Sequence, residues 1–256
     1  MKDFFSFVNE FQKKNEPFAI ATVIKIQGSS SAKPSSKAVI NQVGDVIYGW
    51  IGGGCAEAQV REEALKCLGL EKTALIDIQM NAETLKEGMA CGGQMQVFIE
   101  PILPKSTLWI LGHNRVAQVL CELANIFNFN IKIYDKELEE NIFLKVEQIF
   151  NQQLDEILPL IKKNDFVVIA TLHINDSETL KQILTTQTHY IAVIASQKRA
   201  KLLLETCEEK DLSRISAPAG LDLGSQTPEE IALSIMSEIV LFQRKNFLKN
   251  SLFQLK

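Results

Sequence analysis

The chain has 256 residues, of which 46% are hydrophobic, so it is long enough to form two domains with substantial cores. Its formal net charge of −4 excludes the basic surface typical of a nucleic-acid-binding protein, so we expect no nucleic-acid partner. Five cysteines at irregular spacing indicate a reduced, cytoplasmic chain without a disulfide framework or a zinc pattern. Since no apolar run reaches membrane-spanning length and the first residues do not resemble a signal peptide, we expect no membrane span.

The first part of the chain mixes helical and extended patterns, which indicates an α+β domain. A first helix is predicted within residues 1–16, with one apolar side formed by Phe4, Phe5, Val8 and Phe11. A second helix is predicted over residues 56–70, with apolar positions at Ala58, Val60, Ala64, Leu65 and Leu68. Extended segments are predicted at residues 18–26, 38–41, 46–51, 73–78 and 95–100, with a hairpin turn at 42–45.

Two prolines mark the boundary between the predicted domains. Pro101 and Pro104 interrupt both helix and strand, so residues 101–105 are predicted to be a linker. This places an N-terminal domain at residues 1–103 and a C-terminal domain at residues 104–256.

The second part of the chain alternates short apolar strands with helices, the pattern of a doubly wound parallel sheet. Strands are predicted at residues 108–111, 130–135, 166–170 and 190–194, with a helix over 116–127. The predicted fold class is therefore α/β: a mixed α+β domain followed by a Rossmann-like, doubly wound parallel-sheet domain. A last helix over residues 228–242 is expected to be buried on more than one side, because its apolar residues spread around it: Ile231, Leu233, Ile235, Ile239, Val240 and Phe242.

A run of three glycines, at residues 52–54, precedes Cys55 and Glu57 at the predicted start of a helix. Glycines let the backbone turn sharply and approach a ligand, while a helix N-terminus favours anions and lowers the pKa of a thiol there. A second thiol, Cys91, also stands beside glycines. These residues indicate a site for a soft or anionic ligand, with Cys55 as a candidate thiol and no residue assigned as catalytic. A glycine turn beside a buried core thiol is the alternative reading.

The turn that begins at Gly112 stands where a Rossmann domain carries Gly-x-Gly-x-x-Gly/Ala. It keeps Gly112 and Ala117 but has Asn114 at the middle position, where a glycine lets the backbone approach a pyrophosphate. Asp135 ends the next predicted strand, where a ribose-binding carboxylate belongs, and Arg115 is a candidate partner for a phosphate. These five residues form a candidate dinucleotide-like pocket with weak NAD(P) binding expected; a Rossmann-type scaffold that has lost or changed its ligand is the alternative.

Together these motifs resemble the XdhC/CoxI family, accessory proteins of molybdenum hydroxylases such as xanthine dehydrogenase. The matching motifs of the first half are Gly28-Ser29, Gly52-Gly53-Gly54-Cys55-Ala56-Glu57 and Ala90-Cys91-Gly92-Gly93. The second half matches at Ala217-Pro218-Ala219-Gly220-Leu221-Asp222-Leu223-Gly224 and at residues 227–235. The chain departs from the family in the first Rossmann turn, where the family usually shows Gly-x-Gly-His-Val-Ala.

The resemblance implies that the chain binds the molybdopterin form of the molybdenum cofactor, protects it while its terminal sulfur is installed, and delivers it to a xanthine dehydrogenase-type hydroxylase. Its implied partners are that hydroxylase and a cysteine desulfurase. Because a delivery protein must cover its ligand and then release it, we also expect a homodimer. The implied cofactor-binding residues are Gly28, Ser29, Gly52, Gly53, Gly54, Cys55, Glu57, Cys91, Gly92 and Gly93. No residue is expected to hold a metal ion as a protein ligand.

An NAD(P)-dependent oxidoreductase that uses the Rossmann-like domain is the alternative function. Two histidines, His113 and His173, lie near predicted strand ends, and both are expected to be structural. Since the sequence shows no obvious proton-transfer dyad, we favour a binding and delivery protein over a catalyst.

Overall fold

The computed structural model describes residues 3–28, 30–80, 93–138, 142–143, 145–171 and 175–252. The chain divides into two compact units, Met1–Pro104 and Lys105–Lys256, each with its own sheet and hydrophobic core. Of the predicted residues, Ser29, Cys91, Gly92 and His173 lie outside the described residues. Among the described residues, no helix is both long and apolar enough to cross a membrane.

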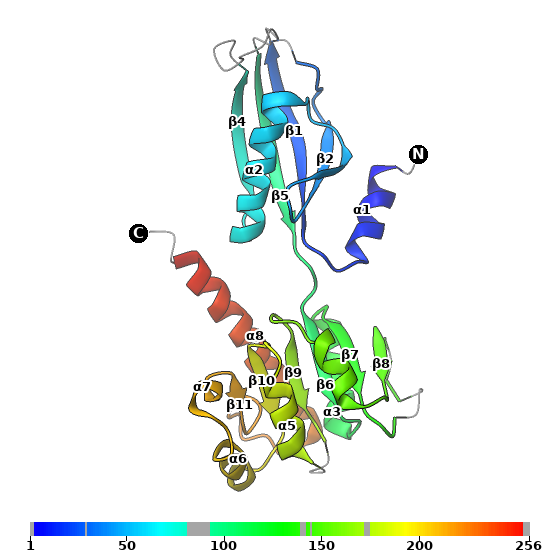
Figure 1. Cartoon of the computed structure of the whole chain (residues 1–256), viewed down its shortest axis with the longest axis vertical. Helices are drawn as coiled ribbons and strands as arrows, with labels where there is room; N and C mark the ends of the chain where they lie inside the picture. The colour runs from blue at the N-terminus through cyan, green and yellow to red at the C-terminus, as the bar shows by residue number, and fades with distance from the viewer. Residues whose placement is uncertain are drawn as a thin grey trace. The chain divides into compact units, whose positions relative to one another are not determined.

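Unit 1 is built on an antiparallel sheet of five strands in the order β3-β2-β1-β5-β4 (Figure 1). The strands are β1 (Phe18–Gly28), β2 (Lys37–Asn41), β3 (Val46–Gly49), β4 (Ala74–Met80) and β5 (Gly93–Ile102). The helices are α1 (Phe4–Gln12) and α2 (Gly54–Leu70). Burial alternates along β5, whose buried side chains face the core together with those of α2, as expected for a sheet covered by a helix. The predicted strands and hairpin of this unit are confirmed.

The predicted apolar faces of both helices in unit 1 are wrong in part. The buried stripe of α2 runs through Ala56, Val60, Ala64 and Cys67, while Ala58 and Leu65 are exposed. In α1, Phe4, Phe7 and Phe11 make the ring contacts with Tyr48 and Phe18, while Phe5 is 75% exposed. Both errors have the same cause, because the apolar residues of these helices fit more than one helical phase.

The predicted linker is also shorter than expected. Strand β5 continues to Ile102, and Pro101 is the register partner of Ala19 in β1. The pairing of β4 with β5 extends only as far as Ile99, so Pro101 lies where no neighbouring strand needs its missing N–H on that side.

Unit 2 is built on a parallel sheet of six strands in the order β11-β10-β9-β6-β7-β8. The strands are β6 (Thr107–Leu111), β7 (Asn130–Tyr134), β8 (Gln148–Phe150), β9 (Phe166–Ile169), β10 (Tyr190–Val193) and β11 (Ile215–Ser216). The helices are α3 (Arg115–Ile126), α4 (Leu154–Ile157), α5 (Asp176–Leu184), α6 (Gln197–Leu204), α7 (Glu209–Leu212) and α8 (Pro228–Leu252), with a 3-10 turn at Leu158–Leu160. Counted in chain order from β6, the strands follow the Rossmann arrangement, whose switch point lies between β6 and β9.

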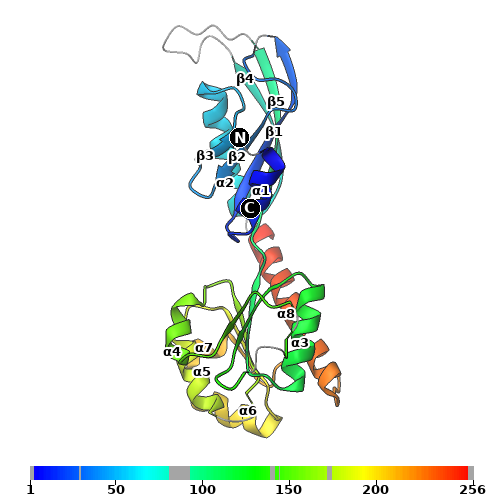
Figure 2. The same ribbon diagram turned by 90° about the vertical axis from the view of Figure 1, so that its right-hand side faces the viewer.

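Helices cover both faces of this sheet. One core contains α3 and α8, and the other contains α4, α5 and α6 (Figure 2). All residues of β6, β9 and β10 are buried, as expected for central strands of a parallel sheet. The predicted doubly wound fold is confirmed.

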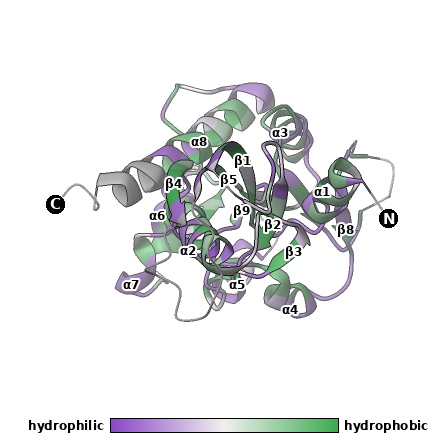
Figure 3. Ribbon diagram, turned by 90° about the horizontal axis from the view of Figure 1, so that it is seen from above, coloured by the Kyte–Doolittle hydropathy of each residue, from purple (hydrophilic) through white to green (hydrophobic). Residues whose placement is uncertain are grey.

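The last helix differs from its prediction. The buried residues of α8 are Ala232, Ser234, Ile235, Met236 and Ile239, whereas Leu233 is 48% exposed. Hydrophobic and hydrophilic residues are mixed along α8 in Figure 3. The expectation of burial on more than one side is therefore confirmed in part. Helix α8 packs on α3 and, through Phe242, on Phe166 and Tyr190 of the sheet, while the side that carries Leu233 stays exposed.

Candidate functional site

The three glycines form the turn that leads from β3 into α2. Gly52, Gly53 and Gly54 have φ angles of 115°, 67° and 57°, a backbone region that side chains disfavour. Gly53 is the N-cap of α2 and makes no side-chain capping bond, so the N–H groups of the first turn have no side-chain cap. Cys55 lies in this first turn and is exposed, so the reading of Cys55 as a core thiol is wrong.

The other described glycines of the predicted site meet near this turn. Gly28 ends β1 and Gly93 begins β5, and the two are register partners. The segment that follows Gly28 reaches the glycine turn, since the Ser31 hydroxyl donates to the Gly52 carbonyl at 3.0 Å. The described residues of all three N-terminal motifs thus lie near one another, with Gly93 as the described residue of the third motif.

The surface beside Cys55 carries an aromatic ring, open backbone and a carboxylate. Trp50 is 45% exposed, and its Nε1 atom lies 3.5 Å from where a Cβ atom on Gly53 would be. A Cβ on Gly54 would meet no atom of the described residues within 4 Å, so the described part of the chain leaves the turn open on that side. Glu57 lies half-buried in the first turn, where its carboxylate complements the helix dipole. Among the described residues, no group of three or more His, Cys, Asp or Glu side chains is placed to hold a metal ion.

In unit 2, the first turn of the Rossmann sheet is held by its own side chains. Gly112 has a φ of 126°, and a Cβ there would lie 2.3 Å from the Ala170 carbonyl oxygen, so close approach of β9 requires this glycine. Asn114 is the N-cap of α3: its Oδ1 accepts from the Ala117 N–H at 2.9 Å. Its Nδ2 donates to the Ala170 carbonyl at 2.7 Å.

The sequence shows no obvious proton-transfer dyad, but the structure brings a histidine and a carboxylate together at this edge. His113 Nδ1 and Asp135 Oδ2 are 2.7 Å apart, and both side chains are partly buried. The other oxygen of Asp135 accepts from the Glu137 N–H at 2.8 Å. A sequence signal for this pair existed, because the two residues follow β6 and β7, which are neighbours in a Rossmann sheet.

The guanidinium of Arg115, the predicted partner of a phosphate, is paired with a carboxylate of the chain. Its guanidinium donates to Glu229 Oε1 from Nε at 3.1 Å and from Nη2 at 2.9 Å. Both partners are about half exposed, so this ion pair contributes little stability, but it ties the first turn of α3 to the first turn of α8.

The sequence reading missed a second charged cluster at the same edge of the sheet. Asp176 begins α5 and its side chain is only 1% exposed. It accepts from the Thr171 hydroxyl and pairs with Arg199 Nη2 at 2.9 Å. These residues follow β9 and β10, so they belong to the carboxyl edge where ligands of parallel sheets bind.

The C-terminal motif is held by a partly buried hydrogen-bond network. Glu238 of α8 accepts from the Tyr190 hydroxyl and the Ser216 hydroxyl, each at 2.7 Å, and from the Gly220 N–H at 2.8 Å. Burial and the neighbouring carboxylate of Glu238 raise the pKa of Tyr190, so this phenol stays a donor. The motif therefore has a structural role, because Glu238 fixes the loop that follows β11.

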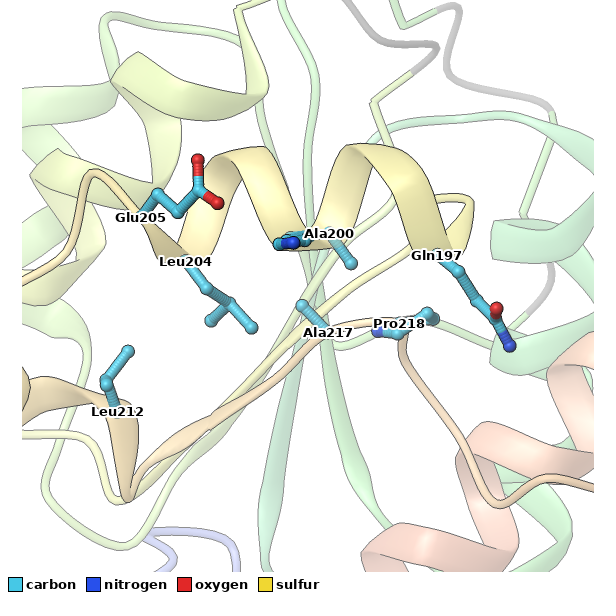
Figure 4. Close-up of a pocket in the computed structure, with 8 residues that line it drawn as sticks. Gln197, Ala200, Leu204, Glu205, Leu212, Ala217 and Pro218 are labelled. Atoms are coloured by element: carbon cyan, nitrogen blue, oxygen red, sulfur yellow. The ribbon is translucent and has the colours of Figure 1, made fainter.

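A cavity of about 480 Å³ lies between α6 and the segment after β11 (Figure 4). Its lining residues are Gln197, Ala200, Lys201, Leu204, Glu205, Leu212, Ala217 and Pro218. It contains none of the predicted site residues, so it supports neither predicted site.

Two family models match the chain. The XdhC and CoxI family matches residues 11–79, and the XdhC Rossmann domain matches residues 108–239. The uncharacterized protein YqeB of Escherichia coli (strain K12) is 29% identical over 247 residues, which cover 90% of this chain and 44% of that protein. A probable xanthine dehydrogenase subunit of Bacillus subtilis (strain 168) is 29% identical over 155 residues, covering 58% of this chain and 46% of that protein.

A solved structure shares the fold. The crystal structure of a xanthine dehydrogenase from Bacillus halodurans matches with a TM-score of 0.52 and 22% identity, covering 92% of this chain and 95% of that chain. The chain spans less than half the length of the two curated relatives. Because the XdhC Rossmann domain alone matches more than half of its residues, the chain belongs to the XdhC/CoxI family.

Proposed function

We propose that the chain binds the molybdopterin form of the molybdenum cofactor, protects it while its terminal sulfur is installed, and delivers it to a xanthine dehydrogenase-type molybdenum hydroxylase. Family membership supports a role in the maturation of such an enzyme, and the similar protein of Bacillus subtilis is named as a probable xanthine dehydrogenase subunit. In this proposal the hydroxylase receives the cargo, a cysteine desulfurase supplies the sulfur, and the chain works as a cytoplasmic homodimer.

The observation that carries the proposal is the exposed thiol of Cys55 on an open glycine turn at the start of α2. The cargo carries a phosphate and a molybdenum centre bound through a dithiolene, so it is both anionic and soft. Backbone N–H groups at a helix N-terminus suit phosphate and oxo groups. A thiolate suits a soft metal–sulfur centre. No atom of the described residues fills the space beside Gly54, which leaves room for a ligand beside the thiol.

The test compares the full-length protein with its Cys55→Ala and Cys55→Ser variants. Each protein is dialysed against molybdopterin, and the bound fraction is measured by the fluorescence of the oxidised pterin. We expect Cys55→Ala to lower the affinity about tenfold or more, which is about 1.4 kcal/mol, without lowering the melting temperature. The matched control is Cys207→Ala, which removes a half-buried thiol from unit 2 and should leave binding unchanged.

The same samples also test delivery, by activation of a hydroxylase that lacks its cofactor. The proposal fails if Cys55→Ala binds and activates like the unmodified protein. Equal losses in the Cys55 variants and in the Cys207 control would point to a general effect of thiol removal and would count against the assignment of the site.

A further inference from the structure

The carboxyl edge of the unit 2 sheet has the topology of a dinucleotide site. In Rossmann proteins the pyrophosphate meets the backbone at the start of the first helix, and a carboxylate after the second strand binds the ribose hydroxyls. The corresponding positions here are Asn114 before α3 and Asp135 after β7. A dinucleotide can therefore bind here only if the N–H groups at the start of α3 and the carboxylate of Asp135 can contact it.

The pyrophosphate position is taken by the Asn114 side chain. Its Oδ1 accepts from the Ala117 N–H at 2.9 Å, so the chain caps its own helix where a phosphate would otherwise accept. Its Nδ2 is tied to the Ala170 carbonyl at 2.7 Å, so the side chain is held by β9 as well as by α3. Gly112 is likewise explained without a ligand, because a Cβ there would lie 2.3 Å from the same carbonyl oxygen.

The ribose position is taken by an imidazole. The two oxygens of Asp135 accept from the Glu137 N–H at 2.8 Å and contact His113 Nδ1 at 2.7 Å. A ribose hydroxyl that bound Asp135 would have to displace one of these partners. His113 is the partner with a side chain that can turn away, so it is the residue that competes with a ribose.

The other charged groups at this edge of the sheet are also paired with side chains of the chain itself. Arg115 pairs with Glu229, and the buried Asp176 pairs with Arg199 and accepts from Thr171. On the described part of this edge, a phosphate or a ribose could bind one of these cations or carboxylates only by breaking an existing contact.

We infer that this Rossmann unit does not bind a dinucleotide, because His113 holds the ribose position on Asp135 and Asn114 holds the pyrophosphate position on α3. NAD(P) does not fit the residues present, so the unit supplies no hydride chemistry. The inference concerns unit 2 alone and does not depend on the function proposed for Cys55.

The experiment titrates NADH and NAD⁺ into the full-length protein by calorimetry. We expect no saturable binding up to about 1 mM for the unmodified protein. The double variant His113→Ala/Asn114→Gly removes the two side chains that occupy the ribose and pyrophosphate positions. It should therefore bind NADH with a Kd at least about tenfold below about 1 mM. Each single variant should gain less than the pair. The matched controls are His189→Ala and Asn128→Gly, which make the same changes at exposed positions away from this edge.

Each outcome decides the inference. Saturable NADH binding by the unmodified protein overturns it, and this measurement requires no variant to fold. A folded double variant that gains no binding overturns the assignment to His113 and Asn114. Should the double variant fail to fold, NMR of the His113 ring in the unmodified protein provides the second measurement. We expect a ring protonated at Nδ1 whose signals do not change with NADH, and NADH-dependent signals would contradict the inference.

Discussion

At the residue scale, the described cysteines differ in how reactive their environments make them. Cys55 is exposed at the start of α2, whereas Cys67 and Cys121 are buried in the two units. Burial raises the pKa of Cys67, and burial reinforced by the charge of Glu122 raises the pKa of Cys121 to about 11. Since the thiolate is the nucleophile, the buried thiols should react slowly at neutral pH.

This difference predicts the order of labelling by iodoacetamide. At pH 8, a thiol with a pKa of about 11 is about one-thousandth thiolate, so Cys121 should be labelled far more slowly than Cys55 in the folded protein. The rate for Cys121 should rise as the pH approaches 11, provided that the protein stays folded. Peptide mass spectrometry across pH measures both rates, and labelling in denaturant is the control. Faster labelling of Cys67 or Cys121 at pH 8 would remove the basis for Cys55 as the site thiol.

At the element scale, Glu238 connects α8 to β10, β11 and the loop after β11. Its carboxylate accepts three hydrogen bonds, from the side chains of Tyr190 and Ser216 and from the Gly220 N–H. Gly220 also needs to remain glycine, because it has a φ of 97° and a Cβ there would lie 2.3 Å from the Ser234 hydroxyl. The loop is therefore fixed by α8 on two sides.

We expect Glu238→Ala to destabilise the protein by about 2–3 kcal/mol, because it leaves a buried tyrosine hydroxyl and a backbone N–H without their acceptor. Glu238→Gln keeps one acceptor oxygen and should cost less. Tyr190→Phe should rescue part of the loss when combined with Glu238→Ala, since it removes the orphaned donor. Urea unfolding measures all four proteins, and Glu209→Ala on the exposed surface of α7 is the control. A change within about 0.5 kcal/mol for Glu238→Ala would contradict the structural role.

The elements differ in how far the sequence could predict them. The central strands of unit 2 were predictable because β6, β9 and β10 are short, fully buried apolar runs. The edge strands β8 and β11 were missed, because runs of three and two residues carry no periodic signal. Helical phase failed in α2, since Leu65 and Cys67 are both apolar and only the packing decides which one is buried.

The candidate sites also differ in how far the sequence could predict them. The placement of Cys55 after a glycine turn is local, so the sequence predicts it and α2 does begin there. The His113–Asp135 pair depends on β6 and β7 lying side by side in the sheet, so it follows from topology rather than from spacing along the chain. Asp176 and Arg199 meet for the same reason, because they follow neighbouring strands.

At the scale of the whole molecule, the chain consists of two units with separate cores. The first core contains residues of β1, β2, β4, β5 and α2, and the others contain only residues after Lys105. The backbone hydrogen bonds of each sheet are likewise made within one unit. A unit that buries its own apolar surface and pairs its own strands meets the physical requirements of a domain.

We therefore expect residues 1–104 and residues 105–256 to fold as separate fragments. Each should show a cooperative thermal transition and dispersed amide NMR signals. The fragment of residues 105–256 should be the more robust of the two, because helices cover both faces of its sheet, whereas in the described part of unit 1 one long helix, α2, covers the core. Circular dichroism and NMR of both fragments, beside the full chain, provide the measurement. A fragment with helical signal but no cooperative transition would show that its core is completed by the rest of the chain, and the division into two independent domains would be wrong.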